Sequence, residues 1–341
     1  MLVAVALTLL AAAPAASGTL VVLNKAEATA SLIDLASGAV AVTLPTGEGP
    51  HEAATSPDGR LVLAANYGTS QAPGSTLTVI DVPGARVVKT IALGKYTRPH
   101  GVQWLADGRH ALATCEGSKA LVIVDVEAGT VAGAIDTGQE VSHMVAVTPD
   151  GTRAFVASIG SGTLTAFDLR ARTLLKVVPT GKGAEGIDVT PDGREVWITN
   201  READTVSIVD AATLQVVATL PAKAFPIRVK VTPDGRHALV SCARTGDVAV
   251  FEVATRLKEL RRVPMKLDAA AAKDGRIFQD FGASPVPVGI LVTPDGKLAY
   301  VANTNADAVA VVDLASWQVV GILKAGKEPD GMAYTPLSAR K

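Results

Sequence analysis

One unit of seventeen residues recurs along the chain and limits the folds that the chain can adopt. Its clearest copy, Ser142–Ser158, reads SHMVAVTPDGTRAFVAS, which is two apolar runs joined by a Thr-Pro-Asp-Gly turn. Pro149 fixes φ at the first corner of the turn, and Gly151 can take the left-handed conformation that closes a short hairpin. The flanking runs are rich in Val, Ala and Phe, which favours strands. The unit is therefore predicted to be a β-hairpin.

The hairpin recurs with an almost constant period. Successive turn aspartates lie 49, 43, 42, 42 and 61 residues apart, and Pro336 marks a degraded seventh copy 42 residues after Pro294. The six aspartates are Asp58, Asp107, Asp150, Asp192, Asp234 and Asp295. A second marker gives the same count, because seven acidic residues each end a predicted third strand and begin a polar turn, where a carboxylate can accept backbone N–H groups. These are Asp34, Asp81, Asp125, Asp168, Asp210, Glu252 and Asp313.

A fixed period near 42 residues indicates a repeat architecture. The chain begins one strand into a repeat, with strands expected at Gly18–Asn24, Thr29–Asp34 and Val40–Leu44, and it ends on a first strand at Gly331–Pro336. The two ends therefore complete one repeat together. An open solenoid would need capping repeats, and the sequence shows none. The expected fold is all-β: a seven-bladed β-propeller of four-stranded antiparallel blades, closed by the pairing of the N-terminal strands with the C-terminal strand.

Two insertions break the period. Gln71–Ser75 lengthens a turn between the second and third strands of its blade, and the longer insertion lies within Met265–Pro285, between two blades. In an up-and-down blade both places lie on one face, which we call the mouth face, and the Pro-Asp-Gly turns lie on the other. Because binding loops concentrate where a rigid scaffold tolerates variation, the mouth face is the expected working face.

The strand sequences resemble a known repeat. The blocks Leu298–Asn303 (LAYVAN) and Val196–Asn200 (VWITN), together with the SPDG and TPDG turns, resemble the YVTN repeats of bacterial exported seven-bladed propellers. The resemblance covers residues 18–336 and extends distantly to lactonase-type propellers and to the haem-binding propeller of nitrite reductases. It implies the propeller fold strongly and a function only weakly, since propellers host many unrelated chemistries.

Composition narrows the class of protein. The chain is 48% hydrophobic and 19% charged, which supplies a core, and its net charge of −1 without a Lys/Arg block argues against nucleic-acid binding. Residues 1–17 are interpreted as a signal peptide, because MLVAVALTLLAAAPAA carries no charge and ends in small residues. Its start lacks the usual Lys or Arg, so a displaced start, a lipid-facing anchor or a buried first strand are alternatives. The expected mature protein is a periplasmic or secreted monomer, one domain at 18–341, without a transmembrane helix.

The two cysteines occupy one repeat position. Cys115 and Cys242 each follow a turn aspartate by eight residues, where other copies have Asn or Ser. Equivalent positions three repeats apart are too distant for a disulfide. Two free, buried thiols are therefore expected.

Candidate chemistry gathers at one position, seven residues before each turn aspartate, at the start of the innermost strand. In the resembled fold this position surrounds the mouth of the central channel. It holds His51, His100, His143, Glu185, Ile227, Val288 and Asp330. Around the ring the order is Asp–His–His–His–Glu, with two apolar members opposite. Neutral imidazoles and carboxylates facing one pocket are what a zinc, copper or iron site needs.

Other interpretations remain open for these residues. Pro-His-Gly is a common start for this strand in the resembled repeats, where the His only fills the funnel and bonds a neighbouring carbonyl. Candidate contacts for an anionic ligand are Arg228, Arg98, Tyr96 and Lys182, each of which is otherwise a solvated loop residue. His110 and His237 are expected on the surface, half exposed.

Three functions are compatible with the sequence. The first is an exported binding or scaffold propeller that holds a small-molecule or protein ligand, or a metal ion, at the channel mouth. The second is a metal-dependent hydrolase or lactonase with His51, His100 and His143 as ligands and Glu185 or Asp330 as general base. The third is a propeller that holds haem or another tetrapyrrole through one His.

Overall fold

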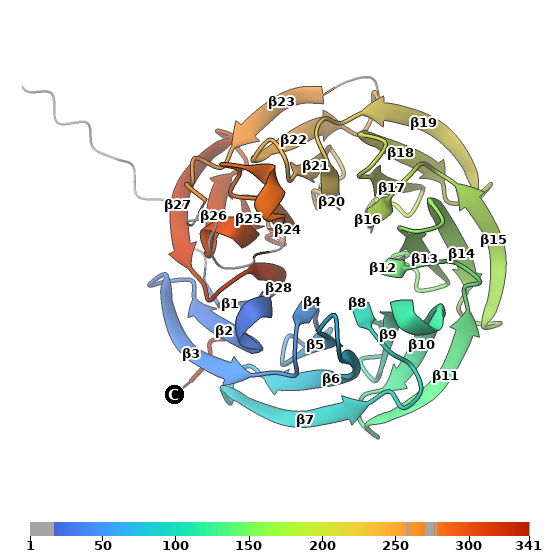
Figure 1. Cartoon of the computed structure of the whole chain (residues 1–341), viewed down its shortest axis with the longest axis horizontal. Coiled ribbons are helices and arrows are strands. Elements are labelled where there is room, and N and C mark those ends of the chain that lie inside the picture. The colour runs from blue at the N-terminus through green and yellow to red at the C-terminus, as the bar shows by residue number, and fades with distance from the viewer. Residues whose placement is uncertain (1–16, 257–258, 270–275, 277, 341) are drawn as a thin grey trace, which may run out of the picture.

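A computed structural model describes residues 17–256, 259–269, 276 and 278–340. In this part of the chain, 28 strands form seven four-stranded sheets, each with its strands in the order of the sequence except for the blade that joins the two ends. The sheets stand as blades around a central channel (Figure 1), with one strand of each blade innermost. The predicted seven-bladed propeller is confirmed.

Each blade runs from an innermost strand beside the channel to an outermost strand at the rim of the ring (Figure 1). In that order, the closing blade is β28 (Pro329–Thr335), β1 (Thr19–Asn24), β2 (Thr29–Asp34) and β3 (Ala39–Pro45). The next three are β4 (Pro50–Thr55), β5 (Leu61–Gly68), β6 (Pro73–Asp81) and β7 (Arg86–Ala92); β8 (Pro99–Trp104), β9 (His110–Cys115), β10 (Ala120–Asp125) and β11 (Thr130–Asp136); and β12 (Ser142–Val147), β13 (Arg153–Ser158), β14 (Thr163–Asp168) and β15 (Thr173–Pro179). The last three are β16 (Ala184–Val189), β17 (Glu195–Asn200), β18 (Thr205–Asp210) and β19 (Gln215–Pro221); β20 (Pro226–Val231), β21 (His237–Cys242), β22 (Asp247–Glu252) and β23 (Glu259–Pro264); and β24 (Pro287–Val292), β25 (Leu298–Asn303), β26 (Ala308–Asp313) and β27 (Gln318–Lys324). Among the described residues, four short 3-10 helices lie between strands: η1 (Lys25–Glu27), η2 (Glu116–Ser118), η3 (Gln279–Phe281) and η4 (Thr304–Ala306).

The two ends of the chain close the ring as predicted. Strand β28 pairs antiparallel with β1, in a register that places Thr19 opposite Thr335 and Leu20 opposite Tyr334. Outside the sheet, the Thr19 hydroxyl donates to the Leu337 carbonyl at 2.8 Å. The innermost strand of this blade therefore comes from the C-terminal end, and the ring has no free inner edge there.

The recurring turns have the geometry that their sequence requires. Gly151 has φ +67°, and its turn is held by the Thr148 hydroxyl, which donates to Asp150 Oδ1 at 2.5 Å. The carboxylate at the end of β14 caps the next turn, because Asp168 Oδ1 accepts the Ala171 N–H at 2.7 Å. These aspartates thus stabilise the turns in which they lie by accepting hydrogen bonds, as the sequence predicted.

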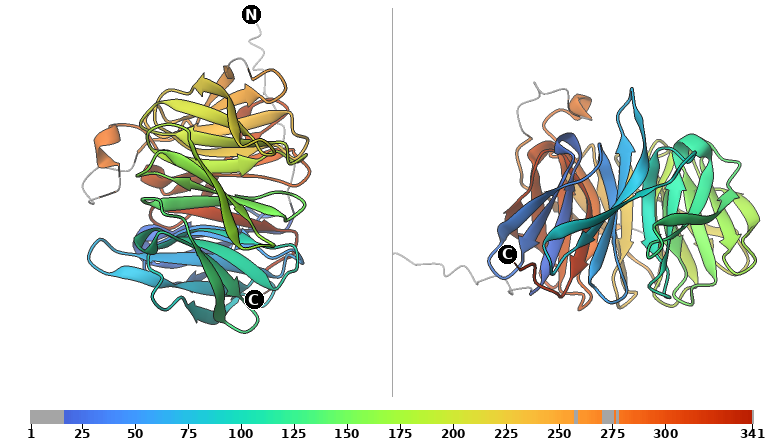
Figure 2. Two further views of the ribbon diagram at one scale, coloured as in Figure 1. Left: turned by 90° about the vertical axis from the view of Figure 1, so that its right-hand side faces the viewer. Right: turned by 90° about the horizontal axis from the view of Figure 1, so that it is seen from below.

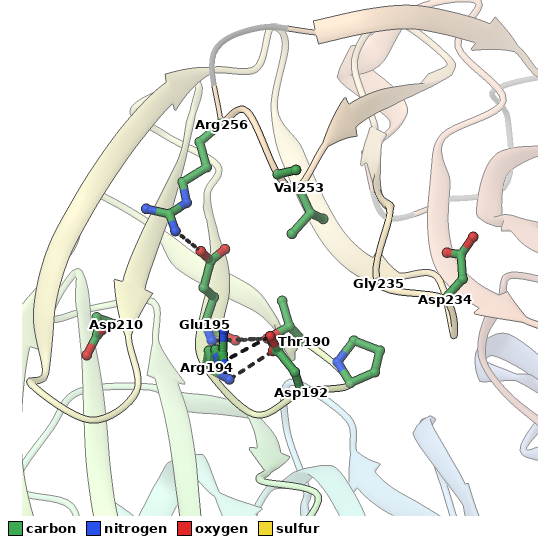
Figure 3. A pocket seen from close by; sticks show the side chains of 11 residues that line it. Thr190, Asp192, Arg194, Glu195, Asp210, Asp234, Gly235, Val253 and Arg256 are labelled. Carbon is green, nitrogen blue, oxygen red and sulfur yellow. Dashed lines mark hydrogen bonds and ion pairs between the residues drawn. The ribbon is translucent and has the colours of Figure 1, made fainter.

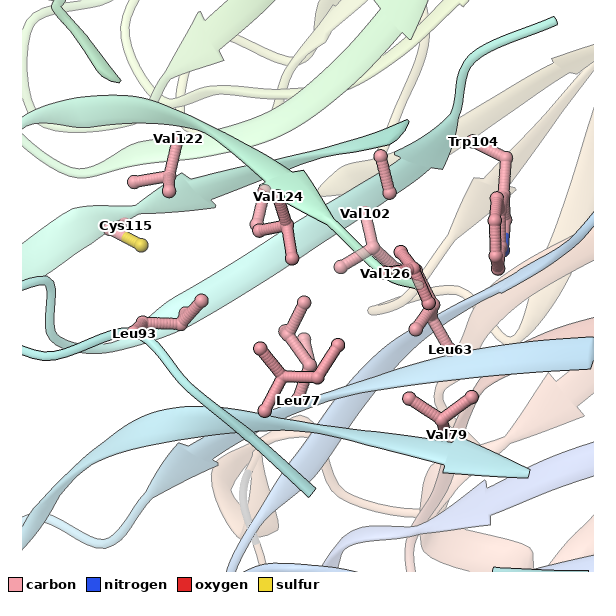
Figure 4. Close-up of a cluster of buried hydrophobic side chains, with 14 of the residues drawn as sticks. Leu63, Leu77, Val79, Leu93, Val102, Trp104, Cys115, Val122, Val124 and Val126 are labelled. Atoms are coloured by element: carbon pink, nitrogen blue, oxygen red, sulfur yellow. The ribbon is translucent and has the colours of Figure 1, made fainter. Parts of the chain in front are cut away.

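The hydrophobic core consists of the layers between neighbouring blades. Figure 4 shows one such layer, in which Leu63, Leu77 and Val79 of one blade meet Val122 and Val124 of the next. All five are at most 2% exposed, so each blade buries an apolar face against its neighbour. This stacking holds the innermost strands in fixed positions around the channel.

Both cysteines lie in these layers as predicted. Cys115 and Cys242 are free thiols with no exposed surface. Burial raises the pKa of each thiol to about 12.

The described parts of both insertions project from one face of the ring (Figure 2). Part of Gln71–Ser75 is strand rather than loop, because β5 and β6 run on beyond the usual length and Gly68 pairs with Pro73. In the longer insertion, Arg276 forms a two-pronged ion pair with Asp307, with N–O distances of 2.7 and 2.8 Å. Residues 270–275 and 277 lie outside the described residues.

The proposed signal peptide also falls almost wholly outside the described residues, which begin at Ser17. Among those described, no helix has the length and apolar character needed to cross a membrane.

Candidate functional site

The mouth of the channel is built from irregularities at the start of the innermost strands. In β8 the pairing register shifts between Pro99 and Val102, which releases the Gly101 N–H from the ladder. That N–H donates to the Thr114 hydroxyl at 2.8 Å, and the same hydroxyl donates to the carbonyl of His143 on the next blade. Thr114 therefore joins two blades at the position where their histidines stand.

Glycine is required where these strands meet. A Cβ on Gly101 would lie 2.8 Å from the His143 carbonyl oxygen and 2.9 Å from the Val145 nitrogen, both backbone atoms. Without a side chain at Gly101, the two strands approach closely enough to bring the imidazoles of His100 and His143 within 3.5 Å, measured between ring centroids.

The three histidines of the sequence prediction lie side by side. His51 is 4.8 Å from His100 between ring centroids, and Tyr67 packs on His51 at 4.5 Å. His51 Nδ1 is 2.7 Å from the Gly49 carbonyl, so this nitrogen carries the proton and Nε2 keeps its lone pair. The three imidazoles and the Tyr67 ring therefore form an aromatic cluster on one side of the mouth.

Glu116 completes this cluster and was missed by the sequence reasoning. One of its oxygens accepts the Tyr67 hydroxyl at 2.6 Å, and the other contacts His143 Nδ1. Its side chain is only 6% exposed. Glu116 lies nine residues after the turn aspartate Asp107, and the same repeat position supplies Tyr67 and Arg201 to the mouth. The constant offset of this position from the turn aspartates was the available signal.

His100, Glu116 and His143 have the arrangement of a metal-binding group. Each can offer one ligand atom, and these atoms all lie within 4.8 Å of one another. His100 Nδ1 is buried and has no hydrogen-bond partner among the described residues. Burial, together with the nearby His143 and His51, lowers the pKa of His100 well below its ordinary value. His100 is therefore neutral at pH 7 and has a lone pair available for a metal ion.

His143 is held between two carboxylates. Burial alone would lower its pKa, but the charge of Glu116 and the hydrogen bond to it raise the pKa above the ordinary value. Its Nε2 lies 3.2 Å from Glu185 Oε1. For Glu185, burial favours the neutral acid, but His143, Arg201 and Arg228 outweigh burial and lower the pKa to about 2.

The other two predicted ligands are committed to ion pairs. Glu185 accepts from Arg228 at 2.9 Å and from Arg201 at 2.8 Å. Asp330 Oδ2 lies 3.1 Å from Lys25 Nζ, in a pair that is almost fully buried. The structure thus separates the five-residue set of the sequence prediction. His100 and His143 join Glu116, His51 packs beside His100 with its Nδ1 on the Gly49 carbonyl, and the two carboxylates bind cations.

Arg228 spans the channel rather than facing a ligand from a loop. Its Nε and Nη2 donate to Glu52 at 3.0 and 2.8 Å, although Glu52 belongs to a blade 176 residues away in sequence. Its Nη1 donates to Glu185, and the Arg228 side chain is 7% exposed. Arg228 and Glu52 also line a cavity of about 320 Å³ in the channel, together with Asp188, Lys230 and other residues of the innermost strands. His51, His100 and His143 are not among the residues that line this cavity.

The remaining candidates have varied surroundings. Arg98 lies over the Tyr67 ring at 5.0 Å, Tyr96 packs on a core layer, and Lys182 is exposed. Ile227 and Val288 are buried opposite the histidines, as the apolar members of the ring. His110 bonds Asp107 and His237 packs against Trp317, and both are partly exposed as predicted.

A second hollow lies on the opposite face, between two blades (Figure 3), and has a volume of about 430 Å³. Its polar groups satisfy one another: Arg256 pairs with Glu195, and Thr190 donates to Asp192. A similar groove lies between Thr148 and Ala212 on the preceding blades. The repetition indicates a feature of the blade packing.

Comparison with known proteins agrees with the architecture. Residues 104–268 match the family described as YNCE-like beta-propeller. This chain is a seven-bladed β-propeller. A chain of the Kuenenia stuttgartiensis hydrazine synthase is 20% identical with a TM-score of 0.70, covering 88% of this chain and 94% of that chain.

A functionally unknown protein from Desulfotomaculum acetoxidans DSM 771 is 14% identical with a TM-score of 0.76, covering 95% of this propeller and all of that chain. No curated protein matches the chain. At these identities the likeness establishes the fold alone.

Proposed function

We propose that this propeller binds a divalent transition-metal ion at its channel mouth, with His100, Glu116 and His143 as ligands. The observation that carries the proposal is the buried His100 Nδ1, which has no hydrogen-bond partner in the described part of the chain and lies close to ligand atoms of Glu116 and His143. A buried polar atom without a partner is costly, and a metal ion would satisfy it. Two imidazoles and a carboxylate suit zinc, copper or iron.

The surroundings of the ligands also suit a metal ion. Glu116 is fixed by the Tyr67 hydroxyl, and the Gly101–Thr114–His143 connection fixes the two histidine-bearing strands. Such supporting hydrogen bonds orient metal ligands and strengthen binding. His51 stands next to this group and becomes a fourth donor only if its ring moves towards the ion.

A binding function is favoured over hydrolysis because the candidate bases are occupied. Glu185 contacts two arginines and has a pKa of about 2, so it is a weak base at pH 7. Asp330 is paired with Lys25. A single metal ion is favoured over a tetrapyrrole because His100, Glu116 and His143 bring three ligand atoms within 4.8 Å of one another, whereas a haem iron takes only one or two axial ligands from the protein.

Export of the chain is part of the proposal. It rests on the uncharged, apolar run at residues 2–16, and it would expose the site to metal ions outside the cytoplasm.

The test is calorimetric titration of chelator-treated, dialysed protein with Ni²⁺ and Zn²⁺. One ion per chain is expected to bind, and His100→Ala or Glu116→Gln should weaken binding at least tenfold, since each removes a ligand. The matched control is His110→Ala, which removes a partly exposed imidazole on the opposite face. Equal affinities for the wild type, His100→Ala and His110→Ala would refute the proposal.

A further inference from the structure

The proposed metal centre has three ligands so far and needs a fourth donor. Zinc in its structural protein sites is almost always held by four ligands in a tetrahedron, whereas His100, Glu116 and His143 offer three ligand atoms. His100 is 2% exposed, His143 is 7% exposed and the Glu116 side chain is 6% exposed. Because the whole group is buried, a fourth donor from the protein is favoured over one from solvent.

The donors that surround the group differ in their availability. Glu185 and Asp330 are each held by basic side chains in ion pairs with N–O distances of 2.8–3.1 Å. His51 instead bonds a backbone carbonyl through one ring nitrogen, and its ring lies 4.8 Å from that of His100 between centroids. His51 is therefore the neighbouring side chain with a donor atom to spare.

His51 is oriented in the way that metal-binding histidines are. Its Nδ1 donates to the Gly49 carbonyl at 2.7 Å, which leaves the lone pair on Nε2. Histidines that bind a metal ion through one ring nitrogen almost always donate from the other nitrogen to a carbonyl, a carboxylate or water. The His51 ring must still move towards the ion, and its contact with the ring of His100 keeps this movement short.

Tyr67 connects His51 with the ligands already proposed. Its backbone N–H donates at 3.1 Å to the Gly49 carbonyl, the same oxygen that accepts from His51. Its hydroxyl donates to Glu116 at 2.6 Å. Its ring packs on His51 at 4.5 Å and on His100 at 5.8 Å between centroids. One residue thus contacts or orients three of the four donors.

We infer that His51 is the fourth ligand, and that its Nε2 closes a tetrahedral site with His100, Glu116 and His143. The inference rests on the proposed function and deepens it, because a closed tetrahedral site determines which ions the mouth selects. Zn²⁺ and Co²⁺ accept four ligands in a tetrahedron, whereas Ni²⁺ prefers square-planar or octahedral coordination. None of the four donors lines the channel cavity of about 320 Å³, which fits a site closed to water.

The first measurement is the visible absorption spectrum of the protein loaded with Co²⁺. Tetrahedral Co²⁺ has intense d–d bands, whereas six-coordinate Co²⁺ has weak ones. The wild type is expected to show intense bands, and His51→Phe should lose most of their intensity, because it keeps a ring against Tyr67 and His100 without a donor nitrogen. His51→Ala is the second variant, for the case that the larger ring disturbs the packing. The matched control is His110→Ala, which should keep the wild-type spectrum.

The second measurement is the ratio of the Kd for Ni²⁺ to the Kd for Co²⁺, obtained by calorimetry. A given set of ligands generally binds Ni²⁺ more tightly than Co²⁺, which makes this ratio smaller than one. A closed tetrahedral site reverses the order, so the wild-type ratio is expected to exceed one. Removal of the His51 nitrogen should raise the Kd for Co²⁺ by about tenfold or more and return the ratio to below one.

The outcomes distinguish this inference from the proposed function. If Co²⁺ binds through His100 but the wild type shows only weak bands or a ratio below one, or if the His51 variants keep its spectrum, the inference is wrong and the proposed function stands. If neither Co²⁺ nor Ni²⁺ binds to the wild type, the proposed function fails and the inference fails with it. Intense bands that the His51 variants lose and His110→Ala keeps support the inference.

Discussion

Removing the guanidinium of Arg228 tests whether the ion-pair network across the channel stabilises the ring. The Arg228 side chain is 7% exposed, that of Glu52 is 13% exposed and that of Glu185 is 3% exposed. In Arg228→Met, Glu185 keeps Arg201, but Glu52 loses the only ion-pair partner that it has among the described residues. Burial already raises the pKa of Glu52 despite the pairing, so an unpaired charge there is costly. We expect a loss of about 3–5 kcal/mol in the free energy of unfolding.

The assay is urea denaturation at pH 7, followed by far-UV circular dichroism. Arg194→Met is the matched control, because its guanidinium is 83% exposed and its partner Asp192 lies 3.7 Å away, so the expected change is at most about 1 kcal/mol. The double variant Arg228→Met/Glu52→Leu should recover part of the loss, since it removes both charges. A loss in Arg228→Met no larger than that of the control would show that the network contributes nothing to stability.

Three further predictions concern the thiols, the mouth and the closure of the ring. Burial raises the pKa of Cys115 and Cys242 to about 12, so their thiolates form only as the pH rises towards that value. At pH 8, iodoacetamide should therefore leave both thiols unmodified until urea unfolds the protein. Mass spectrometry checks this, and rapid native labelling would contradict it. Gly101→Ala should lower the free energy of unfolding, measured by urea denaturation, by about 1–3 kcal/mol and weaken Ni²⁺ binding, because its Cβ would displace the His143 backbone. The control is Gly133→Ala, where the tightest contact of the new Cβ is the end of the flexible Arg172 side chain. Equal effects of the two substitutions would refute the packing argument. Deleting residues 329–341 removes β28 and should abolish the cooperative thermal transition, whereas an unchanged melting curve would deny the closing role of that strand.

The fold was predictable because each repeat contains the residues that determine its own turns and strands. A Pro-Asp-Gly turn fixes a hairpin, and the offset from one turn to the next fixes the blade, so the closure by β28 and β1 followed from counting strands at the two ends. The predicted strand boundaries were less accurate at the first insertion, Gln71–Ser75. There the ladder continues through Gly68 and Pro73, because added residues can extend a hairpin as well as its loop.

The site was predictable only for one ring of positions. Counting back from each turn aspartate found His51, His100 and His143, because those positions share a place in the repeat. It did not find Glu116, which comes from the position after a second strand and reaches the histidine of the next blade. Side-chain direction across a blade boundary is set by packing, which the repeat period does not encode.

The ion pairs across the channel could not be predicted from the sequence, for a different reason. Arg228 and Glu52 are 176 residues apart and belong to blades that are not neighbours, so only the closed ring brings them together. The sequence marked Glu185 as a metal ligand, but its partner Arg228 was interpreted as a ligand contact or a loop residue, and its partner Arg201 was not singled out.

Anomalous diffraction from crystals soaked in Zn²⁺, with data collected on both sides of the zinc absorption edge, tests the central claim most directly. The account predicts one strong anomalous peak within bonding distance of His100, Glu116 and His143, and no such peak in crystals of His100→Ala. Anomalous peaks found only at surface groups such as His110, with none among these three residues, would contradict it.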